Sequence, residues 1–414
     1  MHKPRGQAAI GFIFVTLLID VMGFGIIIPV LPDLIKGLIH ADLSAASGYA
    51  GILLAIYATM QFFFAPFIGN LSDRFGRRPV LLCSLLGFSI DYFLTAFAPT
   101  IWWLFIGRTI AGITGASFTT ASAYIADVSS PEKRAANFGL VGVAFGVGFI
   151  VGPMLGGVLS SWNIHYPFFA AGGFALLNAL FGYFILPESL AVENRRPLDL
   201  KRCSPWGTLI QLRKYKSVLK LAVSLFLVFL AVQSVQTVWA YFTMYQFHWS
   251  RTEVGWSLGF VGFLIAAVQG GLIRIILPKF GNEKAIWMGL LLYTVGLILF
   301  AFASKGWMMY AILIPYCLGG IAGPAIQGYI SNSVPDNEQG ELQGGLTSLQ
   351  SIASILGPII MTGAFHYFTR PNPFFHFPGM QFILGAILML ISALFVIRTF
   401  RKTKKPIEEP TVYQ

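Results

Sequence analysis

The chain reads Gly69-Asn70-Leu71-Ser72-Asp73-Arg74-Phe75-Gly76-Arg77-Arg78-Pro79 between two long apolar segments. Gly76 permits a tight turn, and Pro79 suits the first turn of a following helix, where its missing N–H is not needed. Three arginines alone would be enough to fix membrane topology, but they would require neither Asp73 nor the glycine spacing. The stretch therefore predicts a short loop between two membrane helices that carries an ion cluster at the membrane face.

The composition of the whole chain is typical of a membrane protein. Of its 414 residues, 56% are hydrophobic and only 11% are charged. A soluble domain carries about a quarter charged residues, so this chain lacks the polar surface that a water-soluble enzyme needs. Its three cysteines are scattered without CxxC spacing, which excludes a disulfide framework and a zinc site. We expect an all-α integral membrane protein that is not an enzyme and binds no metal or cofactor.

Polar or turn-forming breaks divide the chain into apolar stretches, and a spanning helix needs about 20 such residues. The twelve predicted spans are 8–36, 45–70, 79–98, 101–126, 135–160, 166–187, 219–245, 252–278, 283–304, 307–332, 339–367 and 376–399. The one long polar loop lies at the midpoint of the chain. We therefore predict two six-helix bundles, 1–187 and 219–400, joined by a cytoplasmic linker at 188–218 and followed by a cytoplasmic tail at 401–414.

An internal repeat supports two pseudo-symmetric halves. The stretch Gly112-Ile113-Thr114-Gly115 recurs as Gly320-Ile321-Ala322-Gly323, and Gly152-Pro153 recurs as Gly357-Pro358, half the chain further on. Many secondary transporters use such a duplication to place a substrate site between the halves, near the midplane of the bilayer. A receptor or a scaffold has no need of this symmetry, so the repeat favours a transporter.

The lysines and arginines are distributed unevenly around the predicted spans. If the N-terminus is cytoplasmic, the bases on the opposite side are only Lys36, Arg251, Lys305 and Arg370. This positive-inside bias predicts a multi-pass protein of the cell inner membrane with both termini in the cytoplasm. The net charge of +11 does not indicate nucleic acid, because the bases lie next to spans, where anionic lipid explains them.

Few charged side chains lie inside the spans. Asp20 lies about a third of the way through the first span, Asp91 lies in the third, and Arg108 lies about one turn into the fourth. A charge at such a position is costly unless it is paired, hydrated or protonated. We expect Asp20 and Arg108 to approach each other in a central cavity and to couple transport to protons, with Asp91 as the weaker candidate. An ion pair that only anchors the helices is the alternative.

The fifth span carries a string of small residues: Gly148, Gly152, Pro153, Gly156 and Gly157. Glycines at four-residue spacing form a groove for close helix contact, and the proline removes a backbone donor and bends the helix. Ordinary packing of small residues is the alternative interpretation of this string.

Polar and aromatic side chains recur on the apolar spans, as they would around a pocket for a bulky amphipathic molecule. Hydrogen bonding between helices predicts the same pattern equally well. The candidate substrate-binding residues are Phe24, Tyr57, Gln61, Phe145, Phe149, Gln233, Gln236, Trp239, Gln327 and Gln350.

The stretch at 69–79 resembles the motif that marks the major facilitator superfamily. The resemblance implies that Asp73 docks against a helix N-terminus of the other half, where the helix dipole favours an anion. It also implies that Arg77 pairs with Asp127 at the end of the fourth span. Together with Arg74, these residues would form a cytoplasmic gate that closes in the outward-open carrier and breaks when the carrier opens inward.

Across nearly its whole length the chain resembles the tetracycline/proton antiporter family of that superfamily. The stretches that carry this resemblance are Asp20–Pro32, Ala65–Pro79, Arg108–Ala116, Gly152–Gly157, Leu186–Ser189, Phe247–Trp249 and Gly340–Gly344. The glycine-proline string of the fifth span is similar to one found in drug/proton antiporters, which favours export. In that family the residues implicated in transport match Asp20, Asp73, Asp91, Asp127 and Arg108.

Two positions depart from the family pattern. Tetracycline exporters usually carry a histidine in helix 8 and an aspartate in helix 9, and Ile265 and Thr294 stand at these places. We therefore expect a cargo other than tetracycline. The predicted function is export of a small amphipathic molecule or drug by proton antiport and alternating access, performed by a monomer and driven by the proton gradient. An importer on the same fold and a non-transporting sensor are the alternatives.

Overall fold

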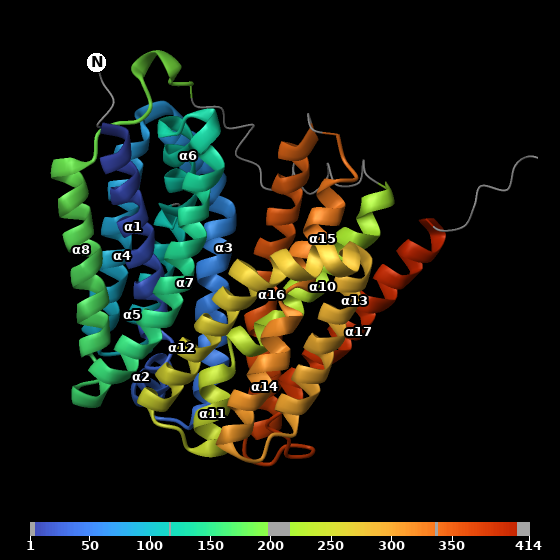
Figure 1. The fold of residues 1–414 in the computed structure, drawn as a ribbon. Coiled ribbons are helices and arrows are strands. Elements are labelled where there is room, and N and C mark those ends of the chain that lie inside the picture. The colour runs from blue at the N-terminus through green and yellow to red at the C-terminus, as the bar shows by residue number, and fades with distance from the viewer. Residues whose placement is uncertain (1–4, 116, 198–215, 336–337, 404–414) are drawn as a thin grey trace, which may run out of the picture.

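The structure is a computed structural model that describes residues 5–115, 117–197, 216–335 and 338–403 (Figure 1). In these ranges all regular elements are helices. The helices of the first half are α1 (Arg5–Ile27), α2 (Leu31–Ile39), α3 (Leu43–Phe75), α4 (Arg77–Ala96), α5 (Ile101–Thr114), α6 (Ser117–Val128), α7 (Pro131–Trp162) and α8 (Tyr166–Ile185). A short 3-10 helix at Val192–Asn194 follows them.

The second half repeats this arrangement. Its helices are α10 (Lys216–Gln236), α11 (Trp239–Phe247), α12 (Arg251–Ala267), α13 (Ile273–Ala301), α14 (Gly306–Gly319), α15 (Ala322–Ser331), α16 (Gln339–Thr369) and α17 (Met380–Thr403). A π-helical turn at Val268–Leu272 joins α12 to α13. The boundaries that the sequence predicts for the two bundles stay predictions, and most of the predicted linker and tail lies outside the described residues.

All twelve predicted spans are helical over most of their length, although their form differs from a row of single helices. Among the described residues, ten helical stretches are long and apolar enough to cross a membrane. One of them, Arg251–Ala301, covers two predicted spans. The chain bends between these two spans at Gly281, where φ is 74°. The predicted fourth span is not among the ten, because a break at Gly115 divides it into the short helices α5 and α6.

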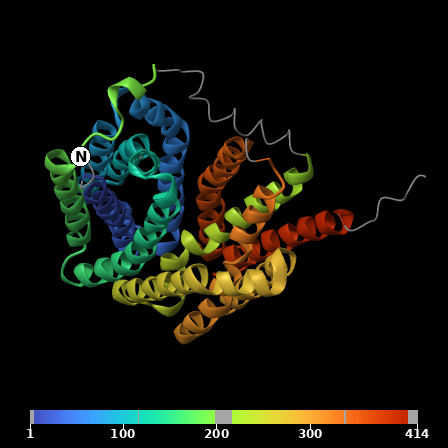
Figure 2. The ribbon, with the colours of Figure 1, turned by 45° about the horizontal axis from the view of Figure 1, so that its top comes forward.

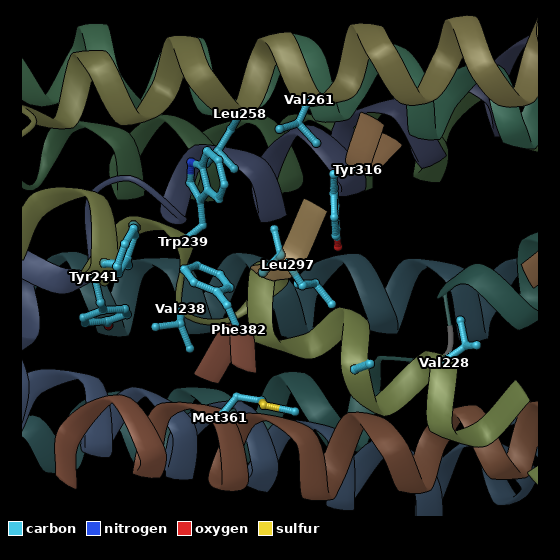
Figure 3. Packing of buried hydrophobic residues seen from close by; sticks show 14 of the residues in the cluster. Val228, Val238, Trp239, Tyr241, Leu258, Val261, Leu297, Tyr316, Met361 and Phe382 are labelled. Atoms are coloured by element: carbon cyan, nitrogen blue, oxygen red, sulfur yellow. The ribbon is translucent and has the colours of Figure 1, made fainter. Parts of the chain in front are cut away.

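The two halves form separate bundles that share one large hydrophobic core region. In Figures 1 and 2 the blue-to-green helices α1–α8 lie on one side and the yellow-to-red helices α11–α17 on the other. A smaller cluster around Phe12, Leu81 and Tyr124 lies within the first half alone. Figure 3 shows part of the larger cluster, in which Trp239 and Phe382 pack among aliphatic side chains of neighbouring helices.

The halves contact each other mainly through two helix pairs, α7 with α12 and α3 with α16. Figure 1 shows the bundles meeting at one end of the molecule and standing apart at the end where α1 begins. We call the latter the basic end, because the loop between α3 and α4 places Arg74, Arg77 and Arg78 there. The other end is called the opposite end below.

Small residues bring α7 and α12 into backbone contact. Gly157 lies against the backbone of Arg251 and Thr252, and the Thr252 hydroxyl donates to the Gly157 carbonyl oxygen at 3.1 Å. Gly255 lies directly against the Pro153 carbonyl group. At these positions α7 and α12 therefore meet main chain against main chain.

Candidate transport site and gates

An ion pair between Arg108 and Asp91 lies inside the first half. The Arg108 Nη2 and Nε groups donate to the two carboxylate oxygens of Asp91, and the Nε–Oδ1 distance is 3.2 Å. The side chain of Asp91 is 0% exposed and that of Arg108 is 13% exposed. Gly107 leaves room for this pair, because a Cβ at this position would collide with Asp91 Oδ1. Burial of both charges at once is tolerated because each compensates the other.

This pair joins Arg108 to the acid that the sequence analysis names as the weaker candidate. The approach of Asp20 to Arg108 stays a prediction, while in the structure the Arg108 guanidinium forms an ion pair with Asp91. The physical reason is the tight connection between α4 and α5, which pack against each other as antiparallel neighbours. Asp91 and Arg108 lie at similar distances from this connection and so meet across it.

Asp20 remains part of the same neighbourhood. It lies half-buried on α1, three residues before Gly23, where a Cβ would lie 2.8 Å from the Tyr92 hydroxyl oxygen. The charges of Asp20, Asp91 and Arg108 all act on the Tyr57 and Tyr92 hydroxyl groups, so the three residues predicted for proton coupling lie in one region of the first half. We call Asp20, Asp91 and Arg108 the charge cluster.

Tyr57 connects the charge cluster to further predicted site residues. The Arg108 guanidinium lies 6.0 Å from the centroid of the Tyr57 ring, and the Phe24 ring lies 5.7 Å from it. The Gln61 side-chain amide donates to the Tyr57 hydroxyl at 3.3 Å and to the Gly115 carbonyl oxygen at 2.9 Å. Since Gly115 lies where α5 ends, its carbonyl lacks a normal helical partner, which Gln61 supplies. The structure thus brings Phe24, Tyr57 and Gln61 together with Arg108.

Trp239 is a correction to the predicted substrate-binding set. Its side chain is 1% exposed, its ring packs edge-on to Phe300 at 5.3 Å, and its indole N–H donates to Ser257 Oγ at 2.9 Å. Figure 3 shows it enclosed beside Leu258. Because its polar atom is satisfied inside the core, Trp239 stabilises the second half and has no surface for a ligand.

The two predicted aromatic residues of α7 differ in exposure. Phe145 is 42% exposed and packs edge-on to Phe118 at 5.3 Å, whereas Phe149 is half-buried. Phe149 also belongs to the α7 backbone that Gly262 of α12 approaches. Phe145 and Phe118 therefore offer an accessible aromatic pair, while Phe149 lies at the seam between the halves.

The predicted glutamines lie in the second half, apart from Gln61. Gln233 packs against Gly357, and Gln327 donates to Gln343 Oε1 at 2.9 Å. The exposed members of the set are Gln236, Gln327 and Gln350. None of the contacts described for these residues joins them to Tyr57 or Gln61.

The glycine-proline string of α7 packs against two helices at once. The members at four-residue spacing that face α1 are Gly148, Gly152 and Gly156. A Cβ at the second of these would lie 2.6 Å from the Met22 carbonyl oxygen, and a Cβ at the third would overlap the Ile26 carbonyl group. The Pro153 ring lies against Gly25 of α1 while its carbonyl group meets Gly255 of α12, and Gly157 contacts α12. The string therefore lies between the helix that carries Asp20 and the other half of the protein.

Arg77 is the centre of the ion cluster at the basic end. Its Nη1 lies 2.5 Å from Asp73 Oδ1 and 2.6 Å from Ser72 Oγ, and its Nε lies 3.3 Å from Asp127 Oδ2. The pairing of Arg77 with Asp127 that the resemblance implies is thus present. Arg74 is exposed and lies over the Phe75 ring at 5.2 Å.

Asp73 forms its ion pair with Arg77 of its own half. At this end the bundles stand apart, as Figure 2 also shows. The resemblance implies that Asp73 is not docked against the other half when a carrier is open at the basic end. The ion pair of Asp73 with Arg77 of its own half agrees with that state. The docking of Asp73 against the second half stays a prediction for the other state.

Glu188 is a residue of this cluster to which the sequence assigns no role. Its carboxylate accepts the N–H groups of Arg77 and Arg78 at 2.8 and 3.2 Å, at the first turn of α4. No side chain of the preceding residues caps this helix, and a negative charge at a helix N-terminus is favourable. Gly76 has φ of 106°, and a Cβ there would collide with the Glu188 carboxylate. The signals in the sequence were an acid just beyond the end of α8 and its place in the stretch Leu186–Ser189, which carries the family resemblance but indicates no partner.

The segment after α8 makes further contacts to the same cluster. The Ser189 hydroxyl donates to Asp127 Oδ2 at 3.0 Å, and the Arg196 N–H donates to the Asp73 carbonyl oxygen at 3.1 Å. The beginning of the connection between the halves is therefore bound to the loop that would form the gate.

We expect Glu188→Ala to lower the free energy of unfolding by about 2 kcal/mol, because it removes the acceptor of two helix N–H groups. Transport should fall at the same time, since Arg77 is held by the turn that Glu188 caps. Thermal unfolding of the purified protein and efflux from cells measure the two effects. Glu193→Ala is the matched control, because Glu193 is an exposed acid of the same segment. Equal stability of the two variants would contradict the capping role.

The comparison with known proteins decides the family. The family described as Major Facilitator Superfamily matches residues 13–358 and 221–413. The chain belongs to the Major Facilitator Superfamily. This membership confirms the predicted fold class and a transporter rather than an enzyme.

Similar members of the superfamily are tetracycline resistance proteins. The chain is 42% identical to the class C protein of Escherichia coli over 387 residues, which cover 94% of this chain and 96% of that one. It is 39% identical to the class H protein of Pasteurella multocida over 390 residues, covering 92% and 95%. Within the Major Facilitator Superfamily, the chain is therefore a member of the tetracycline resistance protein family, as the resemblance predicts.

Solved structures of the superfamily share the fold at low sequence identity. A bacterial homolog of the human lysosomal transporter Spinster, solved in an inward-facing and unoccupied conformation, has a TM-score of 0.76 and 17% identity. The match covers 98% of this chain and all of that one. At this identity the likeness concerns the Major Facilitator fold alone.

Proposed function

We propose that the protein exports a small amphipathic molecule through the cell inner membrane in exchange for protons, by alternating access. The observation that carries the proposal is the charge cluster: two carboxylates and one permanent cation held inside an apolar bundle beside Tyr57 and Gln61. A static anchor would need only one acid for one base.

The charges of the cluster explain how it exchanges a proton. Arg108 stays protonated under all physiological conditions, and its guanidinium pairs with the buried Asp91. With Asp20 also ionised, the three groups carry one net negative charge inside the membrane, which is costly without water. One proton on Asp20 removes that charge. Asp20 therefore exchanges the proton as the carrier changes the access of water, and Asp91 holds Arg108 in place.

The orientation of the protein follows from its basic residues. We place the basic end and both termini in the cytoplasm, in keeping with the positive-inside rule. With this orientation, the end at which the bundles stand apart in Figure 1 faces the cytoplasm, as we expect for a carrier in its inward-facing state. We expect the carrier to act as a monomer, because the two halves of one chain share a hydrophobic core and complete one seam between them.

A tetracycline is the first cargo to test, because the relatives that match nearly the whole chain are tetracycline resistance proteins. The second half nevertheless lacks two polar groups of that family. Ile265 is a hydrocarbon, and the Thr294 hydroxyl donates to the Leu290 carbonyl oxygen of its own helix at 2.8 Å. Neither side chain supplies a proton carrier or a metal ligand. We therefore expect a broader amphipathic drug class than a metal-chelated tetracycline.

Inside-out vesicles with an inwardly acid proton gradient test the proposal. Adding a true cargo should partly collapse the gradient in wild-type vesicles, and Asp20→Asn should abolish the collapse while leaving cargo binding in place. Glu193→Gln, which changes an exposed acid outside the spans, is the control and should behave as wild type. Equal responses of wild type and Asp20→Asn would show that Asp20 does not carry the proton. Binding without movement of any compound would favour the sensor, and uptake together with protons would favour the importer.

A further inference from the structure

Three side chains form a hydrogen-bonded junction between the halves at the opposite end. Ser44 lies in the first turn of α3, and His366 and Thr369 lie in the last turn of α16. The Ser44 Oγ atom lies 3.1 Å from His366 Nδ1, 3.1 Å from the His366 carbonyl oxygen and 2.7 Å from Thr369 Oγ1. We call these three residues the Ser44 junction.

Two of the three junction residues are buried. Ser44 is 0% exposed and Thr369 is 5% exposed, whereas His366 is half-buried. One turn further along α3, Gly48 lies beneath the His366 ring, and one more turn along, Gly51 lies against Thr362 and the Pro358 carbonyl oxygen. These glycines let the backbones of α3 and α16 come close, which leaves little room for water around the Ser44 and Thr369 hydroxyl groups. Hydrogen bonds in such a site are stronger than at a wet surface.

A count of protons shows what His366 contributes. The Thr369 hydroxyl also reaches the Phe365 carbonyl oxygen at 2.6 Å, so four contacts compete for the protons of two hydroxyl groups. Each hydroxyl donates one hydrogen bond only. A proton on His366 Nδ1 supplies a third donor, and this donor points across the seam to Ser44. We take Nδ1 as protonated, because all three contacts that cross between the halves then have a donor, and only the contact to the Phe365 carbonyl oxygen within α16 lacks one.

Two further polar contacts join the halves at this end. The Thr252 hydroxyl of α12 donates to the Gly157 carbonyl oxygen of α7 at 3.1 Å, and Arg251 Nε lies 3.4 Å from Asp33 Oδ2. The side chains of this ion pair are 30% and 38% exposed, and exposed ion pairs contribute about 0–1 kcal/mol because water screens them. The Ser44 junction is the polar contact at this end that joins α3 to α16.

We propose that the Ser44 junction is the outer lock of the carrier. It holds α3 to α16 while the basic end is open, and it must break before the opposite end can open to release cargo. The lock rests on the proposed alternating access, and it gives Ser44, His366 and Thr369 a role in the transport cycle beyond packing. His366 acts as a positioning residue through its Nδ1 donor.

Disulfide trapping tests whether the junction is the lock. Ser44→Cys and Thr369→Cys are combined in a chain whose three native cysteines are replaced by serine and whose connecting segment carries an inserted protease site. Because a disulfide needs Cβ atoms about 3.8 Å apart, oxidation should link the halves only where the structure places the two residues together. We expect one band after proteolysis, two after reduction, and transport that stops on oxidation and returns on reduction. Ser44→Cys with Ser351→Cys, farther along α16, is the control and should give no link.

A conservative pair of substitutions tests the donor. Asn at position 366 keeps an N–H close to the place of Nδ1, whereas Gln places its amide near the position of Nε2. The reporter is Thr362→Cys in the cysteine-free chain, because this side chain lies in the same seam. An impermeant maleimide added from outside modifies this cysteine. Compared with the reporter chain that keeps His366, modification should be about fivefold to tenfold faster in His366→Gln, which corresponds to one lost hydrogen bond. The rate should be unchanged in His366→Asn.

The two readouts separate the lock from the transport function. Trapping and maleimide modification require no cargo, so they report on the lock even if no compound proves to be transported. Absence of the disulfide, a trapped protein that still transports, or equal modification of the Gln and Asn variants would each overturn the lock.

Discussion

Asp91→Asn is expected to abolish transport and to lower the free energy of unfolding by about 3–5 kcal/mol, because it leaves the Arg108 guanidinium buried without its counter-charge. The side chain of Asp91 is fully buried, and both its oxygens accept from Arg108. Asparagine keeps the shape of the side chain, so the effect reports the charge and not a cavity. Vesicle transport and thermal unfolding of the purified protein measure it.

The double variant Asp91→Asn, Arg108→Gln separates stability from mechanism. It removes both charges, so most of the lost stability should return, while transport should stay absent because the cluster no longer holds a cation beside Asp20. Asp127→Asn is the control at the basic end, where a partly exposed pair should contribute about 1 kcal/mol or less. A single Asp91→Asn variant as stable as wild type would refute the buried pair.

Gly156→Ala is expected to separate α1 from α7, because the new Cβ would overlap the Ile26 carbonyl group, which belongs to the main chain and cannot rotate away. Overpacking of this kind costs about 1–3 kcal/mol. Transport should fall by more than the loss of folded protein explains, since α1 also carries Asp20 and its displacement moves the proton site.

Gly142→Ala provides the matched control on the same helix. No atom lies within 4 Å of a Cβ at Gly142, and alanine is the better helix former. This variant should transport as wild type and unfold at the same or a slightly higher temperature. Equal transport and equal thermal unfolding of the two alanine variants would contradict the proposal that the glycine string provides close contact between α1 and α7.

The sequence predicts the spans and the two related halves well, because both depend on local signals. A run of apolar residues long enough for the bilayer identifies a helix wherever it occurs, and the repeated glycine stretch contains a helix break in both halves, at Gly115 in the first and at Gly320 in the second. The pairing of Arg77 with Asp127 follows from a recognisable motif. What the sequence does not contain is which faces of the helices meet.

Three residues illustrate this limit. Arg108 forms an ion pair with Asp91, a partner that depends on how α4 and α5 pack. Trp239 is a core residue, and hydropathy cannot distinguish it from a pocket residue because lipid and protein core are equally apolar. Glu188 caps a helix whose first residue lies 111 positions earlier in the chain, so no local pattern connects the two.

The main-chain seam between α7 and α12 has a consequence for inhibition. Where Gly157 and Gly255 lie against opposing backbone, there are hardly any side chains that can rearrange, so the halves must turn past each other as rigid bodies. An added group as small as a methyl group where Gly157 and Gly255 meet the opposing backbone would hinder this rotation in both directions. A compound that lodged there would arrest the pump whatever drug it carries, and resistance could not be regained by altering the drug-binding residues alone.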